Sequence, residues 1–346
     1  MIEPKFSFTS KIVNSLATIE RIYGSLLEQE LMPSLALSLT QENQILATHH
    51  STSIEGNPLS PRDVTNIVLG DQIPTTKSEK EVKNYFAVLN KIAILAKKNE
   101  PITTNLTKEL HKQLMDGLVA NGLGEFRQGE VFIGHKTRVE IVVKHTPPFH
   151  KREEIEKALQ ELYSWLDNNS TLHPLIRAGI LHHQFAYIHP FFDGNGRLAR
   201  VLTSYFLLLK KYDVVRFFIL DDYYDIDRQQ YSNILHTADS ADETRWLEYF
   251  LEGIGYSLQA ALARINDLKR KDVDHVTGEK RVLVTNREED VIQIIIDKKA
   301  VKTNDIVDEL SVTRQQAHAL LASLVKKGIL NKFGKTKTSY YKLKNP

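Results

Sequence analysis

The stretch His189-Pro-Phe-Phe-Asp-Gly-Asn-Gly-Arg-Leu-Ala-Arg200 decides the interpretation of this chain, because it gathers chemically complementary groups within twelve residues. His189 carries an imidazole that titrates near neutral pH and can therefore accept a proton from an attacking hydroxyl. Asp193 offers a carboxylate to Mg²⁺, a hard cation that binds one or two carboxylates together with phosphate oxygens and water. Both residue types suit a site for a nucleoside triphosphate.

The remainder of the stretch suits the phosphates themselves. Gly194, Asn195 and Gly196 tolerate left-handed backbone angles, so their successive N–H groups can converge on an anion at the start of a helix. Arg197 and Arg200 lie three residues apart and share a helix face, where their planar guanidinium groups can bind phosphate oxygens. We therefore expect a phosphate cradle followed by two neutralising cations.

The flanking sequence favours a functional loop over an ordinary surface turn, which is what an isolated Asp-Gly-Asn-Gly usually forms. Apolar residues at helical spacing run through 173–188 and again through 198–209. The motif therefore joins two buried helices, and such rigid support is typical of a catalytic site.

This segment matches the Fic family signature, His-x-Phe-x-(Asp/Glu)-Gly-Asn-Gly-Arg-x-x-Arg, at each specified position. The resemblance implies a mainly helical enzyme that transfers AMP from ATP to a Ser, Thr or Tyr hydroxyl of a protein and releases pyrophosphate. It also implies that His189 is the base and that Asp193 binds Mg²⁺. The remaining nucleotide contacts implied by the signature are Gly194, Asn195 and Gly196 to the alpha and beta phosphates, and Arg197, Leu198, Ala199 and Arg200 beyond them.

A second motif, Ser51-Thr-Ser-Ile-Glu-Gly-Asn57, lies far upstream in the sequence. Residues 41–55 can form a helix that Gly56 ends, and the simplest interpretation is a capped surface helix. The motif also resembles the inhibitory (Ser/Thr)-x-x-x-Glu-(Gly/Asn) pattern of Fic proteins. The resemblance implies that Glu55 pairs with Arg200 and blocks the position of the gamma phosphate, so that Ser51, Glu55, Gly56 and Arg200 form an internal brake.

A third segment, residues 124–148, is similar to the family's flap, a hairpin that aligns the target hydroxyl. Residues 131–133 and 139–143 are rich in β-branched side chains, and the polar stretch 135–138 between them suits a turn. An ordinary surface hairpin is the alternative. A peptide could add to the hairpin edge through main-chain hydrogen bonds. By resemblance, the flap residues near the nucleotide are Val131, Phe132, Ile133 and Gly134, with His135 where many relatives have a second glycine.

Downstream, residues 223–235 resemble the family's adenine-side helix. Tyr231 and Leu235 lie one turn apart and could bracket a purine, although core packing of Tyr231 is an equal alternative. Asp239 stands where relatives often have an asparagine near the nucleotide. The resemblance therefore adds Tyr231 and Asp239 to the nucleotide site.

Composition fits this interpretation without requiring it. The chain has 346 residues, 42% of them hydrophobic, and a net charge of +2, which says little about partners. It has no cysteine, so disulfides and thiolate chemistry are excluded and a reducing compartment is the simplest setting. No apolar run is long enough for a signal peptide or a membrane span. We therefore predict a cytoplasmic protein that does not bind membranes.

The predicted fold is all-α: a Fic-like helical bundle with an inserted hairpin and a C-terminal winged-helix domain. Apolar residues at three and four spacing, together with a Ser60-Pro61 helix start, predict the helices of the bundle. These helices are expected at 77–98, 104–118, 151–166 and 242–269. The predicted divisions are an N-terminal helical region at 1–100, a catalytic core at 101–268, a charged linker at 269–284 and the winged helix at 285–346.

The C-terminal segment resembles a winged helix-turn-helix, with helices expected at 288–297, 304–310 and 313–327 and a hairpin at 330–343. The helix expected at 313–327 would be the recognition helix. Arg314, Gln315 and His318 are expected to be exposed on it, where they could contact bases in a major groove. Lysines decorate the wing at positions 332, 335 and 337. Winged helices also bind proteins or form dimers, so DNA and protein partners both remain open.

Together these observations predict a protein adenylyltransferase restrained by Glu55, using ATP and Mg²⁺. Its substrate would be a hydroxyl of another protein or of the chain itself, and a homodimer is expected by analogy. The alternatives are a DNA-binding regulator whose Fic domain senses nucleotide, transfer of another nucleotide, or removal of AMP. The intact Gly-Asn-Gly-Arg sequence favours turnover.

Overall fold

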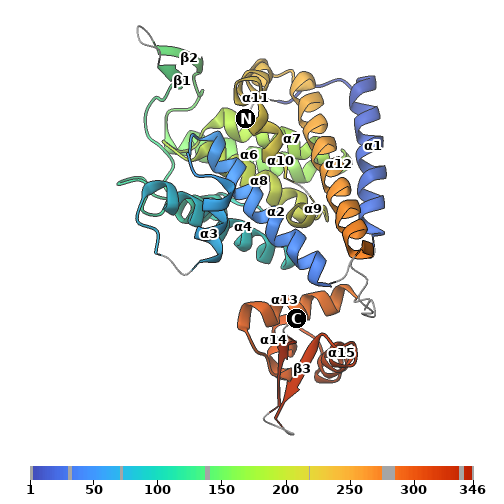
Figure 1. Ribbon diagram of the computed structural model, residues 1–346. Helices are drawn as coiled ribbons and strands as arrows, with labels where there is room; N and C mark the ends of the chain where they lie inside the picture. Colours follow the sequence, from blue (N-terminus) through green and yellow to red (C-terminus); the bar gives the residue numbers. More distant parts are fainter. Residues whose placement is uncertain are drawn as a thin grey trace. The chain divides into compact units, whose positions relative to one another are not determined.

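The computed structural model divides the chain into two compact units (Figure 1). One comprises Met1–Leu27 and Thr40–Lys269, and the other Glu28–Leu39 and Arg270–Pro346. The first unit therefore joins residues that the sequence assigned to an N-terminal region and to a catalytic core. The residues described are 3–29, 33–70, 73–136, 141–217, 219–274, 285–334 and 339–344.

The first unit is helical apart from one hairpin, as the sequence predicted. The helices that lie wholly or mostly in this unit are, in chain order, α1 (Ser10–Leu27), α2 (Pro33–Ile54), α3 (Pro61–Leu69), α4 (Lys77–Lys97), α5 (Thr104–Leu114), α6 (Arg152–Asn168), α7 (Pro174–Ile188), α8 (Asn195–Leu209), α9 (Val214–Phe217), α10 (Leu220–Ile226), α11 (Arg228–Leu235), the 3₁₀ helix η1 (His236–Ser240) and α12 (Thr244–Asp274). The start of α2 and the end of α12 belong to the other unit. Among the described residues, no helix is both long enough and apolar enough to cross a membrane.

Helices α7 and α8 form the centre of this unit. Both are buried on several sides rather than along a single stripe, which is typical of helices surrounded by others. They pack against each other, and α4 and α6 cover them. The loop between α7 and α8 carries the motif at 189–200, so the predicted placement of the motif between two buried helices is confirmed.

Most predicted helices occur close to their expected limits. However, α2 begins at Pro33 rather than at residue 41, and residues 223–235 belong to two helices, α10 and α11, rather than to one. Two further differences have clear local reasons. α5 ends at Leu114 rather than at residue 118, because Met115 leaves the helical conformation and Gly117 adopts a positive φ of 64°. α8 begins at Asn195 rather than at residue 198, because Gly194 adopts a φ of 80° and starts the helix there. The Ser60 cap is confirmed by a complete capping box with Asp63.

Helix α12 closes the unit against α7 and α1. α1 and α12 lie side by side (Figure 1), joined by a 2.6 Å hydrogen bond from the Thr9 hydroxyl to Glu248. On the other side, the fully buried Trp246 donates its indole N–H to the Gly179 carbonyl at 2.8 Å. Gly179 lies so close to α12 that an added Cβ would be 2.7 Å from the Leu247 Cδ2.

The hairpin consists of β1 (Ile133–Lys136) and β2 (Ile141–His145), paired antiparallel with a bulge at Ile133/Gly134. It extends from the helical body in Figure 1. The predicted hairpin is confirmed, but His135 and Lys136 belong to the first strand and not to the turn. An exposed hairpin tolerates polar residues in its ladder, since only one face needs apolar packing. Residues 137–140, which include the rest of the predicted turn, lie outside the described residues.

The second unit contains α13 (Asn286–Lys298), α14 (Thr303–Leu310), α15 (Arg314–Lys326) and a hairpin of β3 (Leu330–Phe333) and β4 (Tyr340–Leu343). This is the predicted order of elements. Apolar residues of all these elements form one core, which includes Ile292, Ile306 and Leu321. The winged-helix assignment itself stays a prediction. Lys335 and Lys337 of the expected wing lie outside the described residues.

We predict that Gly179→Ala lowers the free energy of unfolding by roughly 1–2 kcal/mol, since overpacking a buried contact outweighs the gain in helix propensity. The new methyl group would meet Leu247 and Phe250, both fully buried. Gly255→Ala in α12 is the matched control, because the nearest atom to its Cβ is 4.0 Å away. Chemical denaturation compares the two variants, and equal stabilities would contradict the prediction.

Candidate active site

The motif forms a tight loop between two helices because two of its residues adopt left-handed backbone angles. His189 ends α7 with a φ of 50°, and Gly194 precedes α8 with a φ of 80°. A side chain at Gly194 would also lie within 2.6 Å of the Met115 Sδ. Glycine is therefore required at position 194 both for the backbone angle and for the space.

Asn195 and His111 hold this loop from within. The Asn195 side chain donates to the Phe191 carbonyl at 2.8 Å and accepts from the Phe191 N–H at 2.9 Å. The His111 ring stacks on Phe191 and accepts from the Gly124 N–H at Nδ1. His111 must therefore carry its proton on Nε2, which donates to the Asp193 carbonyl at 3.1 Å. Burial lowers the pKa of His111 to about 4, so it stays neutral in this role.

Arg127, which is fully buried, holds the loop from the other side. Its guanidinium donates to the carbonyls of His189 at 2.7 Å, Gly129 at 2.7 Å and Ile188 at 3.3 Å. Its backbone N–H donates to the Pro190 carbonyl at 2.9 Å. Arg127 thus fixes the backbone on both sides of His189 and links it to the segment that leads into the hairpin.

The surroundings of His189 favour its neutral form. Burial, the Arg127 cation and the neighbouring His145 and His236 lower its pKa to about 3, against a smaller opposing effect of the Ala186 carbonyl. The neutral imidazole is the form that can accept a proton.

Asp193 and Arg197 are joined to each other and to α4. One oxygen of Asp193 accepts from the Gly194 N–H at 2.6 Å and from Arg197 at 3.1 Å. Arg197 also forms a short ion pair with Glu81. The second oxygen of Asp193 makes no hydrogen bond to a described residue, and about half of this side chain is exposed. A carboxylate oxygen is therefore available beside the start of α8.

Arg200 lies at the centre of a buried polar cluster. Its guanidinium donates to the Ser51 hydroxyl at 2.7 Å, the Ser51 carbonyl at 2.9 Å and Glu55 at 2.9 Å. Asp221, which accepts from the Tyr85 hydroxyl, lies 3.7 Å away. Burial alone would lower the pKa of Arg200, but Glu55, Tyr231 and Asp221 raise it on balance, so the cation is retained. The predicted pairing of Glu55 with Arg200 is confirmed.

Glu55 also lies directly over the first turn of α8. A Cβ at Gly196 would be 2.5 Å from a Glu55 carboxylate oxygen. The N–H groups of Asn195, Gly196 and Arg197 belong to that first turn, where they have no partner within the helix and favour an anion. The carboxylate of Glu55 therefore occupies an anion-binding position.

The turn after α2 is linked to Arg197 indirectly, through Glu81. Gly56 ends the helix with a φ of 91°, and the Asn57 side chain then donates to Glu81 at 2.8 Å and to the Ser78 carbonyl at 3.0 Å. Glu81 in turn pairs with Arg197. The segment from Ser51 to Asn57 is thus linked to both motif arginines.

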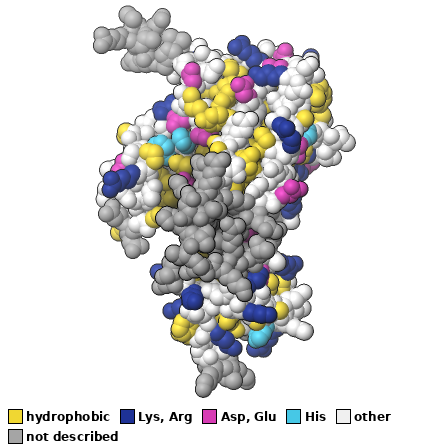
Figure 2. All heavy atoms as spheres, turned by 45° about the vertical axis from the view of Figure 1, so that its right-hand side comes forward, with side chains coloured by type: hydrophobic (Ala, Val, Ile, Leu, Met, Phe, Trp, Pro, Cys, Tyr) yellow, Lys and Arg dark blue, Asp and Glu magenta, His cyan; other side chains and the backbone are white. Residues whose placement is uncertain are grey.

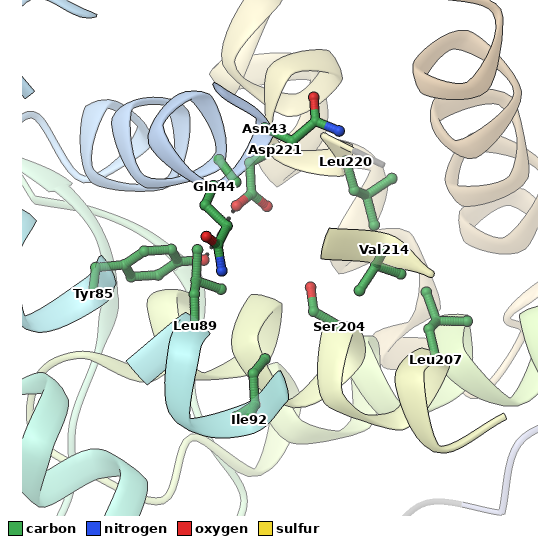
Figure 3. A pocket seen from close by; sticks show the side chains of 11 residues that line it. Asn43, Gln44, Tyr85, Leu89, Ile92, Ser204, Leu207, Val214, Leu220 and Asp221 are labelled. Carbon is green, nitrogen blue, oxygen red and sulfur yellow. Dashed lines mark hydrogen bonds between the residues drawn. The ribbon is translucent and has the colours of Figure 1, made fainter. Parts of the chain in front are cut away.

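A small cavity of about 30 Å³ is lined by residues of α2, α4, α8, α9 and α10 (Figure 3). The Tyr85–Asp221 hydrogen bond lies at its edge, and Leu89 and Ile92 supply apolar walls. This volume suits one or two water molecules. It is far too small for a nucleotide, so the anion position above α8, and not this cavity, is the candidate site.

Tyr231 and Asp239 are committed to other partners. Tyr231 is buried, stacks on Tyr224 at 4.3 Å between ring centres and donates or accepts a 2.8 Å hydrogen bond with His182. This is the core-packing alternative, so we do not assign Tyr231 to adenine. Each Asp239 oxygen lies within 3.0 Å of a histidine ring nitrogen, from His145, His183 or His236, so this carboxylate faces imidazole rings rather than a ribose.

The flap residues lie on or just before strand β1. Phe132 and Gly134 are exposed, and Val131 and Ile133 are half-buried. The base of the hairpin is fixed by Gly129, whose N–H donates to the His150 carbonyl at 2.8 Å. Lys144 of β2 reaches the Ser232 hydroxyl on α11 at 3.2 Å. The nucleotide contacts of the flap residues 131–134 stay a prediction. The same holds for Leu198 and Ala199, which are buried in α8.

Four residues of the site were not identified from the sequence: Glu81, Tyr85, His111 and Asp221. Each lies on another helix, far from the motif in sequence, and carries no local pattern that reveals its partner. Arg127 was quoted as part of the flap without a role. Its position two residues before Gly129, in a short segment poor in apolar residues, gave no signal that it would be fully buried.

We predict that Arg127→Met lowers the free energy of unfolding by roughly 2–4 kcal/mol, because buried carbonyls of the loop lose a charged donor. Arg152→Met is the matched control. It lies in the same region, is half exposed and pairs with Glu125, so we expect it to cost less than about 1 kcal/mol. Urea denaturation of both variants measures the difference. Similar losses of unfolding free energy would contradict the role of Arg127 in holding the loop.

Comparison with known proteins identifies the same region. The model of the Fic/DOC family matches residues 101–207. Protein adenylyltransferase fic-1 of Caenorhabditis elegans is 25% identical over 264 residues, covering 74% of this chain and 48% of that protein. Protein adenylyltransferase Fic of Nematostella vectensis is 30% identical over 185 residues, covering 51% and 41%. The chain thus spans about half the length of these curated relatives.

Solved structures agree on the fold. A Fic family protein from Desulfovibrio desulfuricans G20 is 26% identical, with a TM-score of 0.64 over 100% of this chain and 99% of that chain. Fic-1 from C. elegans is 22% identical, with a TM-score of 0.61 over 74% and 73%. The matched residues include the entire motif, all of α7 and most of α8. Residues 101–207 of this chain are therefore similar in sequence to the Fic/DOC family, and the chain is similar in fold to solved Fic proteins.

Proposed function

We propose that this chain is a protein adenylyltransferase that transfers AMP from ATP to a hydroxyl side chain of a protein. The observation that carries the proposal is the carboxylate of Glu55, which lies on the first turn of α8 and pairs with Arg200. An anion position, a buried guanidinium and a neutral histidine within one Fic motif are what phosphoryl chemistry requires. The curated relatives named above carry the same activity in their names.

In this mechanism His189 accepts the proton of the target hydroxyl as its oxygen attacks the alpha phosphorus of ATP. The new bond joins this oxygen to the alpha phosphorus, and the bond from that phosphorus to the pyrophosphate oxygen breaks. Burial and Arg127 keep His189 neutral before the reaction. The proton is held on the imidazole until solvent removes it.

The phosphates bind where α8 begins. The N–H groups of Asn195 and Gly196 and the cation of Arg197 are placed to bind their oxygens, because the helix start favours anions. Arg200 neutralises the distal phosphates once Glu55 has left. These groups lower the barrier mainly by positioning the phosphates and neutralising charge.

Asp193 fits Mg²⁺. One of its oxygens is fixed by the Gly194 N–H and Arg197, and the other is free of hydrogen bonds to described residues on a half-exposed side chain. A single carboxylate beside a phosphate site is sufficient for this ion, which completes its shell with water and phosphate oxygens. When bound, the ion supplies charge neutralisation on the pyrophosphate leaving group.

Glu55 and Ser51 act as the brake. Both hold Arg200, and Glu55 places a negative charge where a phosphate would otherwise lie. Two anions cannot share this position without strong repulsion, so productive ATP binding requires Glu55 to move. The exposed hairpin beside the loop is the proposed docking edge for the target, which can be a second copy of this chain.

The partner of the second unit is a further proposal. Figure 2 shows several Lys and Arg side chains on the visible face of this unit. Arg314, Gln315 and His318 are all exposed at the start of α15. Such a helix suits phosphates and base edges, so we propose that the unit binds DNA or a protein and directs the enzyme to it. A homodimer and a cytoplasmic location stay predictions.

We predict that Glu55→Gly raises protein labelling from ATP labelled at the alpha phosphate by roughly tenfold or more, equivalent to removing at least about 1.4 kcal/mol of competition. His189→Ala in the Glu55→Gly background abolishes labelling. Labelling is measured at several enzyme concentrations with and without candidate target proteins, which separates self-modification from transfer. ATP labelled only at the gamma phosphate should label nothing.

Glu42→Gly is the matched control for this experiment. Glu42 is exposed on α2, the helix that leads into Glu55, so its replacement weakens this helix without removing a contact to Arg200. Equal activation by Glu42→Gly would show that loosening the helix, and not removal of the carboxylate, releases the enzyme. A Glu55→Gly variant that stays unlabelled, while the chain binds one DNA sequence tightly in an electrophoretic shift, would instead favour the nucleotide-sensing regulator.

The pH dependence should reflect the lowered pKa of His189. The neutral form is the base and is present above the pKa, so activity falls only as the pH drops toward that value. For Glu55→Gly, we expect kcat/KM, which reports the free enzyme, to show no loss attributable to His189 between about pH 8 and pH 5. A midpoint near the ordinary histidine value of about 6.5 would contradict the proposed environment.

A further inference from the structure

Three histidines converge on Asp239 near the base of the hairpin. His145 and His236 each approach one carboxylate oxygen, Oδ2, through Nδ1, at 2.8 Å and 3.0 Å. His183 approaches the other oxygen, Oδ1, through Nε2 at 3.0 Å. The proposed transfer reaction uses none of these four residues, so the cluster calls for an explanation of its own.

The second nitrogen of His145 restricts what can lie between this ring and Asp239. Nε2 lies 2.9 Å from the Tyr187 carbonyl, which can only accept, so Nε2 must carry a proton. Nδ1 therefore faces Asp239 either with a second proton or with a bound cation. A ring whose outer nitrogen donates to a backbone carbonyl is the usual arrangement of histidine ligands to metals.

We propose that His145, His236 and Asp239 form a binding site for a transition-metal ion of the Zn²⁺ class. The two imidazole nitrogens and the carboxylate oxygen all lie within 4.8 Å of one another. Ligands of a tetrahedral zinc ion are about 3.3 Å apart, given bonds of about 2.0–2.1 Å, so small side-chain movements complete the site. Three protein ligands leave a fourth position for water.

The outer shell of this site is already present. His183 donates to the free oxygen of Asp239, and its other nitrogen lies 2.8 Å from Glu243. Both ring nitrogens of His183 thus face carboxylate oxygens, so this ring fixes the orientation of Asp239, as outer-shell partners do in metal sites.

The site differs from the proposed Mg²⁺ position in chemistry and in consequence. Nitrogen ligands select Zn²⁺, Co²⁺ or Ni²⁺ over hard ions such as Mg²⁺. His145 belongs to strand β2, whereas His236 and Asp239 belong to η1. A bound ion would therefore attach the hairpin to the helical body. This inference does not depend on the proposed transfer reaction, because binding is measured without ATP.

The chain offers an internal control in a second group of the same composition, His49, His50 and Asp225. Asp225 there already pairs with the Arg228 guanidinium at 2.7 Å. That positive charge opposes a divalent ion. We therefore expect the second group to contribute nothing to tight binding.

Titration of the metal-free full chain with Zn²⁺ alone, followed by calorimetry, tests the proposal. We expect one equivalent to bind wild type and His50→Ala equally. His236→Ala and Asp239→Asn should bind at least about 100-fold more weakly, at or beyond the upper limit of outer-shell losses. Circular dichroism confirms that each variant is folded, and the half-buried His236 is the ligand whose removal disturbs the core least.

Co²⁺ bound to the wild-type chain provides a measurement that no variant can confound. A four-coordinate site gives intense visible absorption, whereas weak octahedral bands would overturn the proposal. It would also be overturned if wild type binds no Zn²⁺, if His236→Ala binds as wild type does, or if His50→Ala loses the ion. If wild type binds no Zn²⁺, the three histidines are held to Asp239 by hydrogen bonds alone.

Discussion

The buried guanidinium of Arg200 is the constraint on which the site depends. A cation removed from water is tolerated only when its charge and its donors are satisfied, and leaving it unpaired costs on the order of 3–5 kcal/mol. The protein satisfies it through Ser51, Glu55 and Asp221, which come from helices far apart in sequence. In the proposed function, phosphate would satisfy the same cation once Glu55 has moved, so one buried charge would support both a resting state and an occupied one.

This constraint explains why so much of the first unit converges on one short loop. Arg127 and His111 fix the backbone on either side of Phe191, and Asn195 closes the loop on itself. α2 and α4 then reach the two arginines of the next helix through Glu55 and Glu81. Elements from five parts of the chain thus determine the position of a few backbone N–H groups.

The sequence predicted what is local and missed what is distant. The motif and the helices that flank it could be predicted, because periodicity, caps and the signature act over short stretches. The Glu55–Arg200 pair joins residues far apart in sequence, and it was predicted only through the family resemblance. Glu81, Tyr85 and Asp221 could not, since their roles arise only when helices pack. Tyr231 and Asp239 were assigned to the nucleotide by resemblance, and packing gave both other partners. The start of α8 was placed three residues late because the helical angles begin directly after Gly194.

The position of Glu55 just beyond the last residue of α2 has a dynamic consequence. Helix α2 ends at Ile54, and the turn formed by Gly56 follows at once. A side chain in such a turn can leave by rotation about its own bonds, without displacement of the helix that carries it. In the proposed function, exchange between the two states would then take place on the time scale of rotamer changes and loop motion rather than of domain movement. The threshold for switching is therefore set by local contacts and not by the stability of the whole fold.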